Sequence, residues 1–240
     1  MCNTDARKSS AIIAMLEQMV ETRAWKKLRG LESGSDQCRV CSDRRETVHH
    51  IVSGCTVLAS TEYTRRHNNA LMVLAVEWAK REGLLSEDTV WYKEKWKTGT
   101  VIEGSGKKLC WDFEFCMRKP TTARRPDMVL ETQENKNIFI VDMACPSEKN
   151  IQEKRNEKLR KYQQLAYEIR ERRPGYRVEV VPVVIGSLGG GMEVVERDVQ
   201  KLFKEGCRVS ELCREMQKVV LFESESILRK VISGLVQKEE

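Results

Sequence analysis

Residues 125–142 read RPDMVLETQENKNIFIVD, and this stretch decides the fold that we expect for the rest of the chain. Two short apolar runs, 128–130 and 138–141, are separated by polar residues that favour a turn. An aspartate stands at the outer end of each run, Asp127 before the first and Asp142 after the second. Because a strand advances by about 3.3 Å per residue, the two carboxylates meet only if the chain folds back as a β-hairpin.

The segment after the hairpin is predicted to be a helix that begins near Pro146 and ends at about residue 173. This helix carries Lys158 and Lys161. Two carboxylates at a strand end, with lysines on the next helix, favour a Mg²⁺ site with a balancing cation. The alternative is structural, since such aspartates often cap a turn and lysines on an amphipathic helix are usually solvated. The residues alone leave both interpretations open.

The composition is that of a globular protein, because 40% of the 240 residues are hydrophobic and 32% are charged. This length allows one compact domain with an appendage, or two small domains. We expect a soluble intracellular protein, because no apolar run approaches the roughly 20 residues of a membrane span and no signal-peptide pattern is present at the N-terminus. The net charge of +6 and the isoelectric point of about 8.8 are compatible with a polyanionic partner.

A cysteine-rich segment, Cys38-x2-Cys41-x8-His50-x4-Cys55, predicts a zinc knuckle. Zinc takes four N or S ligands in a tetrahedron, and short paired spacings supply them without a large fold. His49 is a competing ligand, but we prefer His50 because His-x4-Cys is the spacing of a knuckle. Such a site is structural or binds nucleic acid, because all four positions are filled. The alternative is a chance grouping within a chain that has nine cysteines, which are expected to be reduced.

The remaining periodicity predicts a small α/β core. A β-branched run at 177–185 is expected to be buried on both faces beside a parallel neighbour, with Pro182 at an edge or a bulge. The glycine-rich residues 186–191 lack the Lys-Ser/Thr ending of a P-loop, and we interpret them as a strand-to-helix turn. The other expected elements are a strand at 109–115 and helices at 10–28, 61–84, 192–203, 209–221 and 225–236.

Several motifs occur in an order that resembles the C-terminal region of site-specific non-LTR retrotransposon polyproteins. That region joins a Cys-Cys-His-Cys knuckle to a restriction-like endonuclease of the PD-(D/E)XK class. The resemblance covers residues 10–236, and the order of five motifs makes it specific although each motif is weak alone. The matching residues are Cys38, Cys41, His50 and Cys55 of the knuckle, Arg66-His67-Asn68, Pro126-Asp127, Asp142, and the helix lysines Lys158 and Lys161 beside Tyr162.

The resemblance implies a Mg²⁺-dependent DNA endonuclease in which Asp127 and Asp142 bind the metal. Lys158 is the first candidate for the catalytic lysine and Lys161 is the second. The product would be a nick whose 3′-hydroxyl primes reverse transcription by the reverse transcriptase domain of the parent polyprotein. A nuclear location follows from this role.

The resemblance also implies how nucleic acid is held. The knuckle, with structural Zn²⁺, and a basic connector at 120–125 would contact target DNA, and RNA is a further candidate partner. The residues assigned to this contact are Arg66, His67, Asn68, Arg124 and Arg125. Spacing alone favours a different interpretation of His67, as a surface or packed histidine.

The sequence departs from this pattern at two points. A general PD-(D/E)XK site has a lysine two residues after the second acid, where this chain has Ala144. The reverse transcriptase that precedes this region in the family is missing here, which suggests a fragment, a decayed copy or a host-adopted piece. The rival functions are an inactive nucleic-acid-binding module and a zinc-stabilised protein-interaction domain.

The expected architecture is therefore restriction-endonuclease-like, with a small mixed sheet flanked by helices. We expect a knuckle in front of this core and helices behind it. The predicted segments are a helical linker at 1–36, the knuckle at 37–60, the endonuclease domain at 61–204 and a C-terminal helical tail at 205–240.

Overall fold

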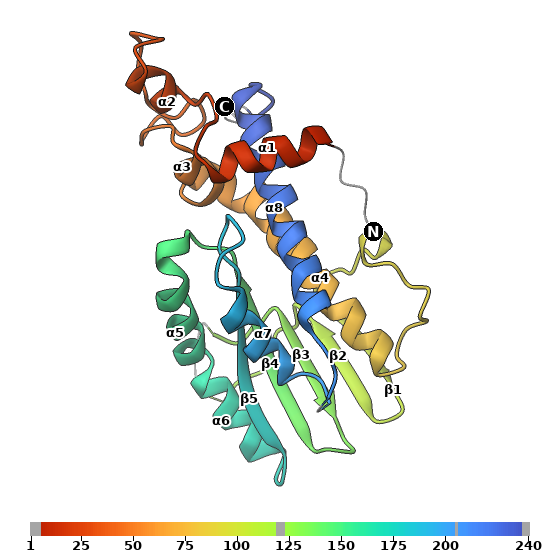
Figure 1. The fold of residues 1–240 in the computed structure, drawn as a ribbon. Helices are drawn as coiled ribbons and strands as arrows, with labels where there is room; N and C mark the ends of the chain where they lie inside the picture. Colours follow the sequence, from red (N-terminus) through yellow and green to blue (C-terminus); the bar gives the residue numbers. More distant parts are fainter. Residues whose placement is uncertain (1–5, 119–122, 205, 237–240) are drawn as a thin grey trace.

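The computed structural model describes residues 6–118, 123–204 and 206–236, and it shows a mixed α/β protein (Figure 1). One sheet of five strands has the order β1-β2-β3-β4-β5, and all neighbours are antiparallel except the parallel pair β4 and β5. This confirms the expectation of a small mixed sheet flanked by helices. The strands are β1 (Thr100–Gly104), β2 (Lys107–Trp111), β3 (Met128–Thr132), β4 (Asn137–Ala144) and β5 (Arg177–Val184).

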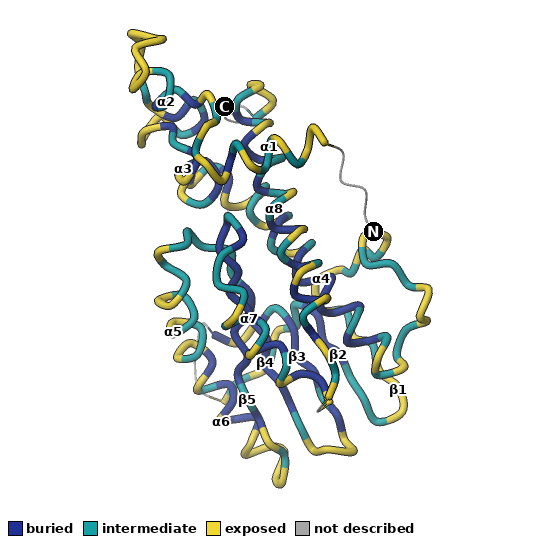
Figure 2. Tube along the Cα trace, in the orientation of Figure 1, coloured by how far each residue is buried: buried dark blue, intermediate teal, exposed yellow. Residues whose placement is uncertain are grey.

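The sheet is covered on both faces. Alternate strand residues such as Leu130 and Val141 share one core with α4 (Thr64–Arg81), α7 (Met192–Gln200) and α8 (Ser210–Ile232). The intervening residues, such as Val129 and Ile140, share a second core with α6 (Gln163–Arg172), and α5 (Ile151–Lys161) lies on the same side. This alternation makes β3, β4 and β5 dark along most of their length in Figure 2, as expected for strands between two helical layers.

The predicted hairpin and the predicted parallel strand are both present. β3 and β4 pair antiparallel, with Met128 opposite Val141, and β4 continues beyond Asp142 to Ala144 instead of ending there. β5 lies parallel to β4 at the outer edge of the sheet. This edge position accommodates Pro182, which has no N–H to donate to a further strand.

A third core lies at the far end of the molecule from the sheet. α1 (Ala6–Leu16), α3 (Val48–Ser53) and the 3₁₀ turn Thr56–Leu58 pack there against the C-terminal half of α8. α8 therefore contributes to both ends of the structure (Figure 1), and the helical pair predicted at 209–221 and 225–236 is one helix. Ser224, which lies in the predicted break, is part of this helix, and its buried hydroxyl donates to the Ser187 carbonyl over 2.6 Å.

Three predicted elements are shorter or broken. The helix expected at 10–28 is interrupted at Gln18, which has φ +58°, and Thr22 caps a separate helix α2 (Arg23–Leu28) by accepting from the Trp25 amide. The helix expected to reach residue 173 begins as a 3₁₀ turn, Glu148–Asn150, and then divides at Tyr162 into α5 and α6. The strand expected at 109–115 ends at Trp111, because Asp112 has φ +46°.

The start of α4 and the edge strand β1 also differ from expectation. The helix predicted at 61–84 begins at Thr64, after a π-helical turn at Ala59–Tyr63. β1 was not predicted, because this edge strand is mostly exposed and so lacks an apolar alternation. A short 3₁₀ turn, Trp91–Lys93, precedes β1. Among the described residues, no helix is long and apolar enough to cross a bilayer.

Candidate active site and metal cluster

The hairpin places Asp127 and Asp142 at the same end of the sheet. Met128 is opposite Val141 in the last pair at the outer end of the hairpin, and Asp127 and Asp142 are the next residues of the two segments. The amide of Met143, the residue after Asp142, donates to Asp127 Oδ2 over 2.6 Å. The two aspartates predicted from the sequence are therefore close neighbours.

Asp142 is buried beneath the junction of α5 and α6. The Tyr162 hydroxyl donates to its Oδ1 over 2.6 Å, and the Lys158 ammonium donates to its Oδ2. The Lys161 ammonium lies 3.8 Å from Oδ1 and is 41% exposed. Burial and the nearby charge of Asp127 raise the pKa of Asp142, although Lys158 and Tyr162 oppose this shift. Of the two predicted lysines, Lys158 is thus the one in direct contact with an acid.

Asp127 has a different set of partners. Its Oδ2 accepts from the Met143 amide over 2.6 Å and lies 3.0 Å from His67 Nε2. Burial opposes the charge of Asp127, but His67, the Met143 amide and Lys158 together hold its pKa below the ordinary value. Neighbouring carboxylates whose pKa values move in opposite directions are typical of functional sites, where one acid stays ionised beside another that ionises less readily.

A cleft of about 480 Å³ opens between the start of α4 and this end of the sheet. Asp127 and His67 both line it, together with Asn68, Trp111 and Asp112. Burial opposes protonation of His67, but its hydrogen bond to Asp127 raises the pKa of the imidazole. His67 therefore lies at the acidic site as a packed, hydrogen-bonded histidine, which is one of the two interpretations that its spacing favoured, and its predicted contact with nucleic acid stays a prediction.

The predicted nucleic-acid contacts occupy two kinds of environment. Arg124 and Arg125 are about half exposed and form ion pairs with Glu114 and Asp112 at 2.6 Å. Arg66 is only 1% exposed, and its guanidinium forms hydrogen bonds within the protein. The part of the basic connector at 119–122 lies outside the described residues.

The four predicted zinc ligands lie together. One ligand atom from each of Cys38, Cys41, His50 and Cys55 falls within 4.8 Å of the other three, and Cys41 Sγ is 3.2 Å from His50 Nε2. A zinc ion about 2.3 Å from each sulfur and about 2.0–2.1 Å from a histidine nitrogen fits such a group. His50 lies among the three cysteines, whereas His49 is exposed and is not part of the group. The hydrogen bond between the Cys38 and Cys55 side chains lowers the pKa of Cys38 and raises that of Cys55, so this close pair shares one proton in the absence of a metal.

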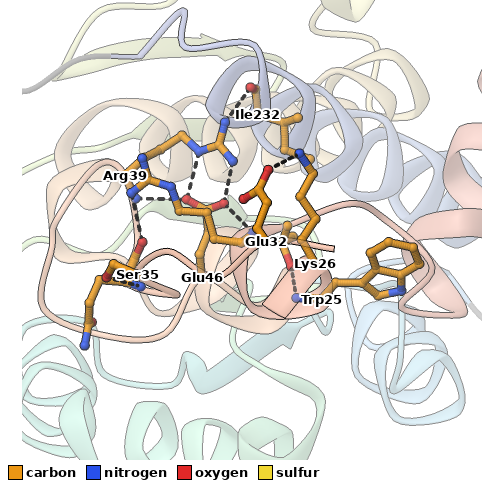
Figure 3. Close-up of polar contacts among 10 residues, drawn as sticks. Trp25, Lys26, Glu32, Ser35, Arg39, Glu46 and Ile232 are labelled. Atoms are coloured by element: carbon orange, nitrogen blue, oxygen red, sulfur yellow. Dashed lines mark hydrogen bonds and ion pairs between the residues drawn. The ribbon is translucent and has the colours of Figure 1, made fainter. Parts of the chain in front are cut away.

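Local interactions hold the ligand-bearing segment in place. The Thr47 side chain accepts from the His50 amide and so begins α3, the helix that carries His50. Glu46 is fully buried and accepts two hydrogen bonds from the Arg39 guanidinium, at 2.7 and 2.8 Å. Arg39 also donates to the Ile232 carbonyl over 2.6 Å (Figure 3). The cluster is thereby fastened to the end of α8, a link that no sequence motif indicated.

Comparison with protein-family models and with curated proteins found no match. The fold and both sites therefore rest on the geometry given above. The spacing of acids, lysines and cysteines was sufficient to find residues that the structure brings together at the two sites. It was not sufficient to find Glu46, Arg39 or the role of His67, because each of these acts through a partner that is distant in sequence or carries no motif.

Proposed function

We propose that this chain is a Mg²⁺-dependent DNA endonuclease with a restriction-like core, of the kind that site-specific non-LTR retrotransposons carry behind their reverse transcriptase. One observation carries the proposal: Asp127 and Asp142 lie together at one end of the hairpin, where the Met143 amide donates to Asp127 and Lys158 contacts Asp142. The pKa values of the two acids are also shifted in opposite directions. Target DNA as the partner and a nuclear location follow from the proposed activity.

The donor set at this end of the sheet suits a hard divalent cation. Asp127 Oδ2 is fully engaged, but Oδ1 receives no hydrogen bond from the described residues. Both oxygens of Asp142 have donors, one of which is the flexible ammonium of Lys158. Carboxylate oxygens are preferred ligands of Mg²⁺, which when bound would polarise the scissile phosphate and make a water molecule more acidic.

The protein residues have distinct roles in this proposal. His67 and the Met143 amide fix the orientation of the Asp127 carboxylate, and Tyr162 fixes that of Asp142. Lys158 balances the charge of the two acids and can turn toward a phosphate. Arg124 and Arg125 are accessible for phosphate contacts, whereas buried Arg66 is not among the proposed DNA contacts.

Nicking of supercoiled plasmid tests the proposal. With Mg²⁺ the wild-type chain should convert the plasmid to the open circle, and with EDTA it should not. Asp127→Asn should reduce the rate by about 100-fold or more, because losing about 3 kcal/mol of metal-dependent stabilisation corresponds to that factor. The matched control is Glu134→Gln, an exposed acid in the turn of the same hairpin, which should nick at the wild-type rate. Equal rates for Asp127→Asn and the wild type would refute the assignment.

A second candidate function is nucleic-acid binding without cleavage. It is favoured by the closed arrangement at Asp142, whose two oxygens are already paired with Tyr162 and Lys158. Under this alternative, a gel shift in EDTA shows DNA binding that weakens with salt, while no Mg²⁺ or Mn²⁺ concentration produces nicks.

A further inference from the structure

The first turn of α4 contacts both the zinc-ligand segment and the acidic site. Tyr63, Arg66 and His67 have the spacing i, i+3 and i+4, which places them on one side of a helix. His67 lies against Asp127, whereas the other two residues reach the zinc-ligand segment. A π-helical turn at Ala59–Tyr63 precedes this point, and such turns are frequent at functional sites.

Tyr63 holds the backbone around two zinc ligands. Its hydroxyl accepts from the Cys55 amide over 3.0 Å and donates to the Ile51 carbonyl over 2.7 Å. Ile51 follows His50 directly, so both ends of the His50–Cys55 segment are tied to one phenol oxygen. Any movement of these two ligands therefore moves Tyr63 or breaks its hydrogen bonds.

Arg66 joins three parts of the structure. Its Nη1 donates to the Val52 carbonyl of α3 over 2.7 Å and to the Ser224 hydroxyl of α8 over 2.8 Å. Its Nη2 donates to the Cys145 carbonyl over 3.2 Å. Cys145 directly follows β4, the strand that carries Asp142 and the Met143 amide bound to Asp127. One side chain thus links the zinc segment, α8 and the strand of the acidic site.

The burial of Arg66 makes this link sensitive to its acceptors. The side chain forms no ion pair with any described carboxylate, and its charge is stabilised by two carbonyls, one hydroxyl and the Tyr63 ring at 5.1 Å. A buried charge is costly unless its hydrogen bonds are satisfied. If α3 moved away, Arg66 would lose the Val52 carbonyl, and we expect the start of α4 to rearrange with His67 on it.

We propose that the zinc cluster positions the acidic site through Tyr63 and Arg66, so that zinc binding is required for the site to hold its divalent cation. The knuckle would then be more than a separate DNA-binding module. Arg66 and Tyr63 are positioning residues, because neither is placed on the metal or on the substrate. The part of this inference that concerns cleavage rests on the proposed endonuclease function, whereas the structural coupling does not.

Hydrogen exchange of the Met143 amide reports this coupling without any activity. The zinc-loaded chain should protect a peptide covering 138–146, and removal of zinc with a chelator should reduce this protection by about 10-fold or more. Arg66→Lys should have the same effect while still binding one zinc per chain by native mass spectrometry. If Arg66→Lys does not fold, the same measurement is made on Tyr63→Phe, which removes only the hydroxyl. Arg65→Lys is the control, because Arg65 is part exposed and pairs with Glu62 and Glu223.

Mn²⁺ binding, followed by electron paramagnetic resonance, gives the second readout. Arg66→Lys should weaken Mn²⁺ binding by about 10-fold and slow nicking at saturating DNA without changing DNA affinity. Unchanged Met143 protection and Mn²⁺ affinity in both Arg66→Lys and Tyr63→Phe would overturn the inference. If no variant or wild-type chain nicks DNA, yet protection still depends on zinc and Arg66, the endonuclease function fails while the coupling stands.

Discussion

Replacing Tyr162 by phenylalanine removes one hydroxyl from the centre of the proposed active site. Tyr162 is fully buried, and its hydroxyl donates to Asp142 Oδ1 over 2.6 Å, with the Arg125 carbonyl 3.1 Å away. A hydrogen bond to a charged group contributes about 1.5–3 kcal/mol to stability, and the ring of phenylalanine leaves the packing unchanged. For a chain of 240 residues each kcal/mol corresponds to about 2–4 °C. We therefore expect the melting temperature of Tyr162→Phe to fall by about 3–12 °C.

Thermal and urea unfolding of the zinc-loaded chain measure this loss. Tyr167→Phe is a matched control, because Tyr167 lies on α6, the helix that begins directly after Tyr162, but is 54% exposed, and it should unfold like the wild type. Nicking by Tyr162→Phe should also slow, because Asp142 loses the partner that fixes its orientation. A Tyr162→Phe chain as stable as the Tyr167→Phe control would show that the hydroxyl does not serve a buried carboxylate, and the described geometry of Asp142 would be wrong.

Two further predictions concern the metal cluster and the lysines. His50→Ala should lose the bound zinc in native mass spectrometry and His49→Ala should keep it, since only His50 lies among the cysteines; zinc retained by His50→Ala would contradict the cluster. Lys158→Met should lower the free energy of unfolding by about 3 kcal/mol and abolish nicking, because it leaves the buried Asp142 charge without its cation. Lys161→Met should change the free energy of unfolding by no more than about 0.5 kcal/mol, because this side chain is 41% exposed. Urea titrations measure both losses, and equal losses in the two lysine variants would show that Lys158 has no special role.

The hairpin could be predicted because its signals are local. The two apolar runs and the turn between them lie within 18 residues, and the acids at their ends follow from the same register. The grouping of Cys38, Cys41, His50 and Cys55 was predictable for the same reason. β1 could not be predicted, because an exposed edge strand is defined by its hydrogen bonds to β2 and leaves no apolar pattern.

The breaks and tethers depend on contacts that are distant in sequence. The division between α5 and α6 falls at Tyr162, a residue that fits a helical stripe but is held by Asp142, 20 positions earlier. Arg66 belongs to a basic motif that suggested a phosphate contact, and only the fold shows that it is enclosed between α3 and α8. Sequence periodicity indicates which face of a helix is apolar. It does not indicate which polar groups from distant parts of the chain form hydrogen bonds with side chains such as Tyr162 and Arg66.

The position of Lys158 bears on the departure at Ala144. Side chains two residues apart in a strand point to the same face, so Ala144 lies on the side of β4 that also carries Asp142. A lysine at 144 would reach the acids from within the strand, whereas here the ammonium comes from α5 and contacts the same carboxylate. The positive charge that β4 lacks at residue 144 is thus supplied by Lys158 of the neighbouring helix α5. The position of α5 is therefore important for Asp142, as is that of Tyr162 at the end of the same helix.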